Sequence, residues 1–242
     1  MHALQVLVGL EIPLEEHHLV PVMESFCECQ KLEEVFSIVN LMRSSDVHFT
    51  RETASQLTNC ISSDIDKVDE AWSVLERMHQ QGKPVDVVSL NAVIHAATLL
   101  NDLQRAIGTY KAFPDFGVKP TISTFNHLLS GCISTSHRAL GDKLLSELRE
   151  LNLVPDTQTF ERVIILCLTQ TVYEDAFFYL EEMKGQGYMP PLSVYTAIIR
   201  KCVVSGDVRW EVALDEMKEC GYTVSPTLQF FIDTGGKMRS RV

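Results

Sequence analysis

The stretch VVSLNAVIHAATLLNDLQRAIGTYKAFPDFGVKP, residues 87–120, decides the fold of this chain of 242 residues. Apolar side chains recur over 88–100 with the i, i+3, i+4, i+7 spacing of an amphipathic helix. Asn101-Asp102 interrupts that pattern, and a second apolar stripe runs over 103–113. The closing Gly117-Val-Lys-Pro120 ends the second helix, because glycine adopts positive φ and proline cannot continue a helix. The stretch therefore predicts a helix-turn-helix hairpin.

The same hairpin pattern recurs along the chain at an interval of 35 residues. In the first helix, a large apolar residue and the residue after it recur at this interval (Leu90-Asn91, Phe125-Asn126, Phe160-Glu161, Tyr195-Thr196). In the second helix, a large apolar residue recurs at the same interval (Met78, Phe113, Leu148, Met183). Glycines in the turn after the second helix also recur at this interval (Gly82, Gly117, Gly187), and Asn152 takes the glycine's place in the fourth unit. Two such helices cannot bury both apolar stripes alone, so neighbouring hairpins must stack. No segment alternates with a strand period, and we expect an all-α fold of stacked 35-residue helix-turn-helix repeats.

Counting outward in steps of 35 divides the chain into six expected repeats. They are a degenerate repeat 1 at 16–50, then repeats at 51–86, 87–121, 122–156, 157–191 and 192–226. Residues 1–15 are expected to be the remnant of an upstream helix, and 227–242 a C-terminal partial helix with a basic tail. The first residues contain no Arg or Lys, so no transit peptide is visible. We expect a processed or truncated chain.

The composition excludes several classes of protein. Hydrophobic residues make up 45% and charged residues 22%, which argues against wholesale disorder. The 21 Lys and Arg against 32 Asp and Glu give a net charge of −11, which argues against a strongly basic nucleic-acid coat. No apolar run approaches the roughly 18–20 residues that cross a bilayer, so no membrane span is expected.

The seven cysteines are an odd number, which excludes a fully paired disulfide scaffold. Cys132, Cys167 and Cys202 lie 35 residues apart, so they are expected to be equivalent, buried and unpaired on successive first helices. Cys27-Glu28-Cys29 is the only close pair, and its spacing does not suit zinc. Catalytic signatures such as a glycine-rich phosphate loop, G-x-S-x-G or H-E-x-x-H are missing. We therefore expect no catalysis, metal, cofactor or small-molecule substrate.

The hairpin motifs resemble the pentatricopeptide repeat. The resemblance lies in VVSLNAVI at 87–94 with GVKP at 117–120, in TFNHLL at 124–129 and in EEMKGQGY at 181–188. The related 34-residue tetratricopeptide repeat carries a Trp/Leu/Gly/Tyr pattern in its first helix, which is missing here. The resemblance covers 51–226 well and the first repeat weakly. It implies a right-handed α-solenoid in a mitochondrion or chloroplast that binds single-stranded RNA along a concave groove, about one base per repeat.

The resemblance also implies which side chains contact RNA. The residue after the apolar residue of each first helix contributes one side chain (Ser55, Asn91, Asn126, Glu161, Thr196), and the last residue of each unit contributes another (Asp86, Thr121, Asp156, Pro191, Pro226). Asn126 with Asp156 is a pairing typical of the family and associated with uracil, and Asn91 with Thr121 is a partial match. The family also carries an aliphatic residue at the second position of each unit, which stacks on the base. Val88 fits this position, whereas Ser123, Gln158 and Ser193 do not. Glu161 with Pro191 departs from the pairs of side chains that the family uses to read a base. The predicted RNA-binding residues are Asn91, Thr121, Asn126, Asp156, Thr196 and Val88.

Two hypotheses remain open at this point. The first is a non-catalytic protein that binds single-stranded RNA in organellar RNA processing, stability or translation, in the mitochondrion or alternatively the chloroplast. The second is a protein-interaction scaffold, for example a solenoid subunit of the mitochondrial ribosome or of another large mitochondrial assembly, with protein partners in that assembly. The first is the leading hypothesis. The net charge and the departures from the family's pattern point towards the second, and Asn91 and Asn126 could equally be residues that tolerate an exposed helix start.

Overall fold

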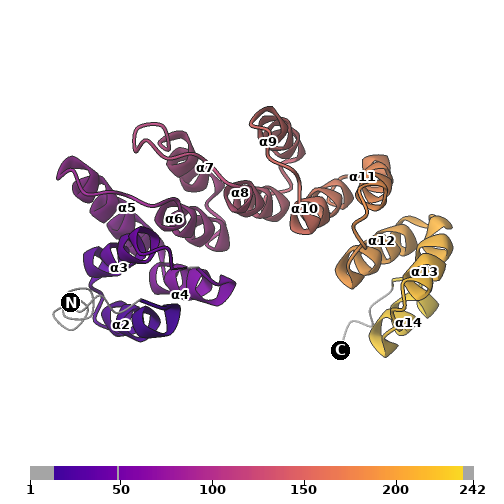
Figure 1. Ribbon diagram of the computed structural model, residues 1–242. Helices are drawn as coiled ribbons and strands as arrows, with labels where there is room; N and C mark the ends of the chain where they lie inside the picture. The colour runs from indigo at the N-terminus through magenta and orange to yellow at the C-terminus, as the bar shows by residue number, and fades with distance from the viewer. Residues whose placement is uncertain (1–13, 48, 237–242) are drawn as a thin grey trace. The chain divides into compact units, whose positions relative to one another are not determined.

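The computed structural model describes residues 14–47 and 49–236, and in that part of the chain it contains thirteen helices and no strand (Figure 1). The first helices of the hairpins, called A helices here, are α2 (Glu16–Glu28), α4 (Arg51–Ile61), α6 (Val87–Leu99), α8 (Ile122–Ser134), α10 (Thr157–Leu168), α12 (Leu192–Ser205) and α14 (Pro226–Asp233). The second helices, called B helices, are α3 (Leu32–Ser44), α5 (Ile65–Gln80), α7 (Leu103–Lys111), α9 (Arg138–Glu150), α11 (Glu174–Gly185) and α13 (Arg209–Glu219). Most of the expected remnant helix of residues 1–15 falls on residues 1–13, which lie outside the described residues, as do residues 237–242 of the basic tail.

The chain forms two compact units, one up to Gly131 and one from Cys132 onward. In the first unit each A helix packs on its own B helix, and the A helices pack in chain order, α2 on α4 and α4 on α6. The second unit repeats this arrangement, with α10 on α11, α12 on α13 and α10 on α12 (Figure 1). The all-α stack of helix-turn-helix hairpins expected from the sequence is confirmed.

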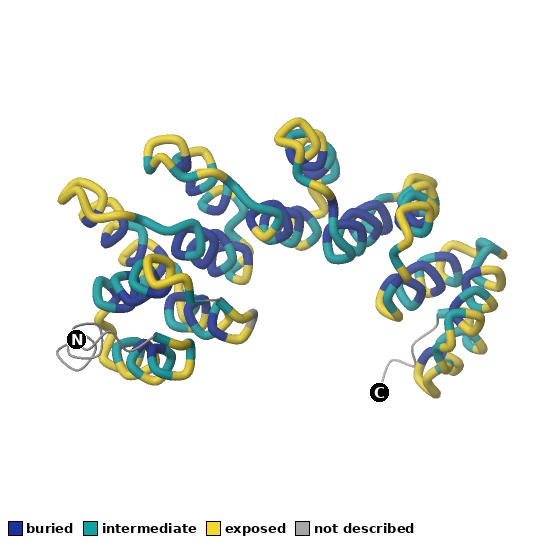
Figure 2. Tube along the Cα trace, viewed as in Figure 1, coloured by how far each residue is buried: buried dark blue, intermediate teal, exposed yellow. Residues whose placement is uncertain are grey.

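The apolar residues that recur every 35 positions form the core of each unit. Leu90 and Phe125 in the first unit, and Phe160 and Tyr195 in the second, are at most 2% exposed. Cys132, Cys167 and Cys202 are fully buried and free, which confirms the expectation of unpaired apolar thiols. Figure 2 shows buried residues recurring along α6 and α10, while the B helices carry exposed residues on their outer sides.

The turn after each B helix uses a left-handed residue, as the sequence predicts for Gly82, Gly117, Asn152 and Gly187. Gly82 has φ +72° and Asn152, the expected substitute, has φ +56°. The next amide closes the turn onto the end of the helix, from Lys83 N to Met78 O over 2.9 Å and from Leu153 N to Leu148 O over 3.1 Å. This bond satisfies a helix-end carbonyl that would otherwise lack a partner.

The helix α7 ends at Lys111, two residues before the predicted end at Phe113. Pro114 explains the difference, because proline disfavours helical backbone at the residue before it. Phe113 nevertheless stays in the core, 1% exposed. Within residues 14–47 and 49–236, no helix combines the length and apolar character that a bilayer crossing requires.

Candidate nucleic-acid interface

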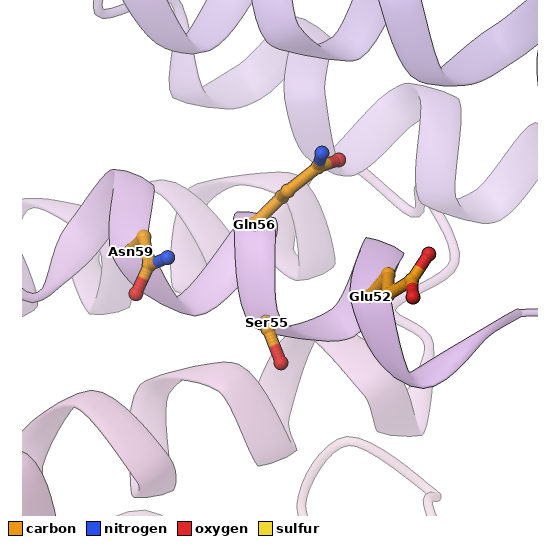
Figure 3. Close-up of a pocket in the computed structure, with 4 residues that line it drawn as sticks. All are labelled: Glu52, Ser55, Gln56 and Asn59. Atoms are coloured by element: carbon orange, nitrogen blue, oxygen red, sulfur yellow. The ribbon is translucent and has the colours of Figure 1, made fainter.

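The candidate interface is the side of the A helices that carries their second, fifth, sixth and ninth residues, called the A-helix face here. The helical repeat of 3.6 residues brings these positions together on one side. On α4 they are Glu52, Ser55, Gln56 and Asn59, and these four side chains line a hollow of about 550 Å³ (Figure 3). The corresponding residues are Val88, Asn91, Ala92 and His95 on α6, Gln158, Glu161, Arg162 and Ile165 on α10, and Ser193, Thr196, Ala197 and Arg200 on α12.

The structure brings together two of the predicted RNA-binding residues, Asn91 and Thr121. The Asn91 amide donates from Nδ2 to Thr121 Oγ1 over 3.3 Å, and Asn91 Oδ1 accepts from the Thr124 hydroxyl over 2.7 Å. These contacts join the fifth residue of α6 to the start of α8. A carboxamide has two N–H groups and two acceptor lone pairs, so one of each remains beyond these two bonds.

Asn91 and Asn126 are both buried, 8% and 3% exposed respectively. The alternative interpretation, that asparagine tolerates an exposed helix start, is therefore wrong for both residues. The start of α6 is capped by Asp86 instead, whose carboxylate accepts from Val88 N over 2.8 Å. The Asn91 amide does not cap the helix but contacts Thr121 and Thr124 at the start of the next A helix.

Asp156 caps the start of α10. Its Oδ1 accepts from Thr159 N over 2.7 Å and from the Thr159 hydroxyl over 2.8 Å, and Asp156 N donates back to that hydroxyl over 3.3 Å. This capping box satisfies two amides of the first turn. At the C-terminal end, Ser225 caps α14 while Pro226 is already helical, so Ser225 is the equivalent of Asp156 there and the assignment of Pro226 was wrong by one residue.

Two further predicted residues, Val88 and Thr196, also lie on the A-helix face. Val88 is half-buried at the second position of α6, and Thr196 is half-buried at the fifth position of α12. The carboxylate of Glu161, a departure from the family's pattern, accepts a hydrogen bond from the Ser193 hydroxyl on α12. Position five of α10 thus presents a negatively charged acceptor.

Sequence reasoning missed a pair of histidines on the same face. The rings of His95 and His127 stack with centroids 4.2 Å apart and planes 23° from parallel. His95 Nδ1 also lies 3.3 Å from Thr58 Oγ1 of α4. Their positions in the sequence could have indicated this pair, because His95 is the ninth residue of α6 and His127 the sixth of α8, and both positions fall on the side that carries Asn91 and Asn126.

Comparisons of the sequence with known proteins point to one family. A profile described as a pentatricopeptide repeat-containing protein matches residues 1–113, and a pentatricopeptide repeat domain profile matches 143–205. The chain belongs to the pentatricopeptide repeat family. It is 26% identical over 152 residues, 62% of its length, to the mitochondrial 15S rRNA processing factor ppr3 of Schizosaccharomyces japonicus, covering 22% of that protein. It is also 26% identical over 122 residues, 50% of its length, to a chloroplastic pentatricopeptide repeat-containing protein of Arabidopsis thaliana, covering 15% of it.

Solved structures of the family share the fold of this pentatricopeptide repeat protein. The crystal structure of PPR10 from maize aligns with 99% of this chain and 35% of its own, at 18% identity and a TM-score of 0.56. The PPR domain of Arabidopsis thaliana protein-only RNase P 1, solved in complex with tRNA, aligns with 75% of this chain and 95% of its own, at 14% identity and a TM-score of 0.62. The chain spans about a quarter or less of the length of the curated relatives it matches.

The charged residues of this pentatricopeptide repeat protein are distributed unevenly. In the described part of the chain, the Lys and Arg residues of the ion pairs lie on B helices or in the turn after one, at Arg43, Lys67, Arg77, Lys83, Arg105, Arg138, Arg149, Lys184, Arg209 and Lys218. Many pairs join successive B helices, as Arg105 Nε does with Asp69 Oδ1 over 2.8 Å. The hydrogen bonds from Arg105 lower the pKa of the Asp69 carboxyl.

The A helices carry few cations that can reach a ligand. Those with described side chains are Arg162, Arg200 and Lys201. Lys201 Nζ donates to the Gln170 carbonyl over 2.7 Å, away from the A-helix face. Arg162 and Arg200 lie on that face, at the sixth position of α10 and the ninth of α12. Arg162 Nη1 donates to the Gln158 carbonyl over 3.2 Å, and the Arg200 guanidinium lies over the Phe231 ring, 5.4 Å from its centroid. No cluster of three or more potential metal ligands occurs among the described residues.

Proposed function

We propose that this pentatricopeptide repeat protein binds single-stranded RNA with its A-helix face and does so without catalysing a reaction. The observation that carries the proposal is the Asn91–Thr121 hydrogen bond, which unites two side chains that the family uses to contact a base. The amide of Asn91 keeps one donor and one acceptor for the edge of a base, and the half-buried Val88 lies one turn before it.

The RNA is proposed to be organellar, and the role to lie in its processing, stability or translation. Support comes from the relatives, which include a mitochondrial rRNA processing factor and a chloroplastic protein. The mitochondrial relative matches the larger share of this chain, which favours the mitochondrion over the chloroplast. Within the chain, Asn91, Thr121, Asn126, Asp156, Thr196 and Val88 are the proposed contacts.

The decisive experiment measures which base is preferred at each position of a bound RNA. Randomised single-stranded RNA would be selected on the purified chain and on the Asn91→Ala and Asn126→Ala variants. Each variant is expected to lose preference at one position, with Asn126→Ala losing a preference for uracil. Loss of a good base contact costs about 1–3 kcal/mol of discrimination. Asn40→Ala is the matched control, because Asn40 lies on a B helix and donates to the Pro84 carbonyl.

The second candidate function is a protein-interaction scaffold within a large assembly such as the mitochondrial ribosome. The net charge of −11 and the small number of cations on the A helices favour it. If selection recovers no RNA even at low salt, the RNA proposal fails and the scaffold becomes the leading candidate. Co-sedimentation with ribosomes then tests whether that assembly is the partner.

A further inference from the structure

Two cysteines meet between the first two A helices of the first unit. Cys27 lies in the last turn of α2 and Cys60 in the last turn of α4, two helices that pack together, and the two side chains interact. One turn earlier, Gln56 Nε2 donates to Glu24 Oε1 over 2.7 Å and joins the same two helices. Both thiols are free and only half-buried, so small reagents can reach them.

The surroundings make the two thiols unequal. The hydrogen bond with Cys27, together with the positive charge of Lys67, lowers the pKa of Cys60. The same hydrogen bond, together with burial, raises the pKa of Cys27. Lys67 is held beside the pair by Gln30 Oε1 at 3.0 Å and Glu70 Oε2 at 2.7 Å, in the first turn of α5. Cys60 therefore gives up its proton more readily than Cys27, which is the asymmetry of a reactive cysteine with a resolving partner.

We propose that Cys27 and Cys60 form a redox-sensitive dithiol that hydroperoxides oxidise to a disulfide between α2 and α4. The Cys60 thiolate attacks the terminal oxygen of the hydroperoxide, the O–O bond breaks, and the alkoxide leaves and takes a proton. The Cys27 sulfur then attacks the sulfenic sulfur of Cys60, and hydroxide leaves with the Cys27 proton as water. The two thiols lose two electrons in total, and the O–O bond gains them. A dithiol reductant reverses the reaction by thiol–disulfide exchange.

The remaining cysteines provide contrasts within the same chain. Cys132 and Cys167 are fully buried, and burial raises the pKa of each to about 12, so their thiols stay protonated and inaccessible. Cys29 is exposed but lies outside the pair, two residues from Cys27. Reactivity in Cys29 would reflect exposure alone, whereas reactivity in the proposed pair requires the contact between α2 and α4.

The test is peptide mapping of the whole chain after brief exposure to hydrogen peroxide. Trypsin places Cys27 and Cys29 in residues 1–31 and Cys60 in residues 52–67. The expected product links these two peptides, with the mass of two hydrogen atoms lost and with reversal by dithiothreitol. The Cys29→Ser variant keeps the link, whereas Cys27→Ser loses it and leaves Cys60 as a sulfenic acid that dimedone traps.

Folded and denatured chains are compared to show that the link depends on structure. The folded Cys29→Ser chain is expected to form it at least about tenfold faster than the same chain in guanidinium chloride, because only the fold brings the thiols together and activates Cys60. Equal rates in the two states overturn the proposal, as does a folded chain whose 1–31 and 52–67 peptides stay unlinked. The outcome does not depend on whether the chain binds RNA.

Discussion

The salt dependence of RNA binding follows from where the structure places its cations. Arg162 and Arg200 are the two arginines on the A-helix face whose side chains are described. Each phosphate neutralised on single-stranded RNA contributes a slope of about −0.7 to the plot of log Kobs against log salt concentration. Two contacts predict a slope of about −1.4, so affinity falls roughly sevenfold between 50 and 200 mM salt. A groove with six phosphate contacts would lose roughly 300-fold over the same range.

Substitution of both arginines tests this count. The double variant Arg162→Gln with Arg200→Gln is expected to bring the slope close to zero while leaving part of the base preference, which Asn91 and its equivalents supply. The matched control is Arg149→Gln with Lys218→Gln, which changes the net charge equally but lies on B helices. Fluorescence anisotropy with labelled RNA at four salt concentrations measures all three proteins. A wild-type slope steeper than about −3, or an equal loss in the control, would refute the reasoning.

Three further predictions concern stability and are measured by urea or thermal unfolding. Asp156→Ala should lower the free energy of unfolding by about 1 kcal/mol through loss of the α10 cap, whereas Asp156→Asn should preserve most of it. Hydrogen bonds from Arg209 hold the pKa of Asp207 below its ordinary value of 3.8, so the ionised carboxylate stabilises the fold fully at neutral pH, and this contribution is lost as the pH falls below about 4. Arg209→Gln should make the free energy of unfolding fall less steeply with acid, and an unchanged acid profile would contradict this. Gly131→Ala places a methyl group 2.8 Å from the nearest side-chain carbon, so overpacking should lower the free energy of unfolding by about 1–3 kcal/mol, more than the added helix propensity restores. Gly108→Ala has open space around it, so it should show the stabilising gain in helix propensity without overpacking.

The hairpins could be predicted from the sequence because their determinants are local. A helix start or end depends on residues within one turn, and a left-handed turn accepts only a few residue types. Asn152 illustrates this, since its place in the 35-residue period was enough to assign it the role that Gly82 plays elsewhere. The premature end of α7 was also encoded locally, in Pro114, but the apolar residue before it masked the signal.

The environment of the candidate site could not be predicted from the sequence in the same way. Asn91 is a polar residue near a helix start, and such residues are commonly exposed. Its burial depends on Thr121 and Thr124, which lie 30 and 33 residues later and approach it only after the hairpins stack. Cys27 and Cys60 are 33 residues apart, which is not the repeat interval, so periodicity gave no reason to connect them. Contacts of this kind depend on the angle between neighbouring helices, which no local pattern encodes.

The net charge of −11 is a weaker argument against RNA binding than it first suggests, because stacking determines where charges meet. Residues about 35 positions apart become neighbours on successive B helices, as Glu174 and Arg209 do at 2.6 Å. Opposite charges at that separation neutralise one another on the B helices and leave the A-helix face mostly uncharged and polar. A face of that kind attracts phosphate weakly and discriminates through hydrogen bonds to bases. If the protein binds RNA, its affinity should therefore depend more on which bases it meets than on how much salt surrounds them.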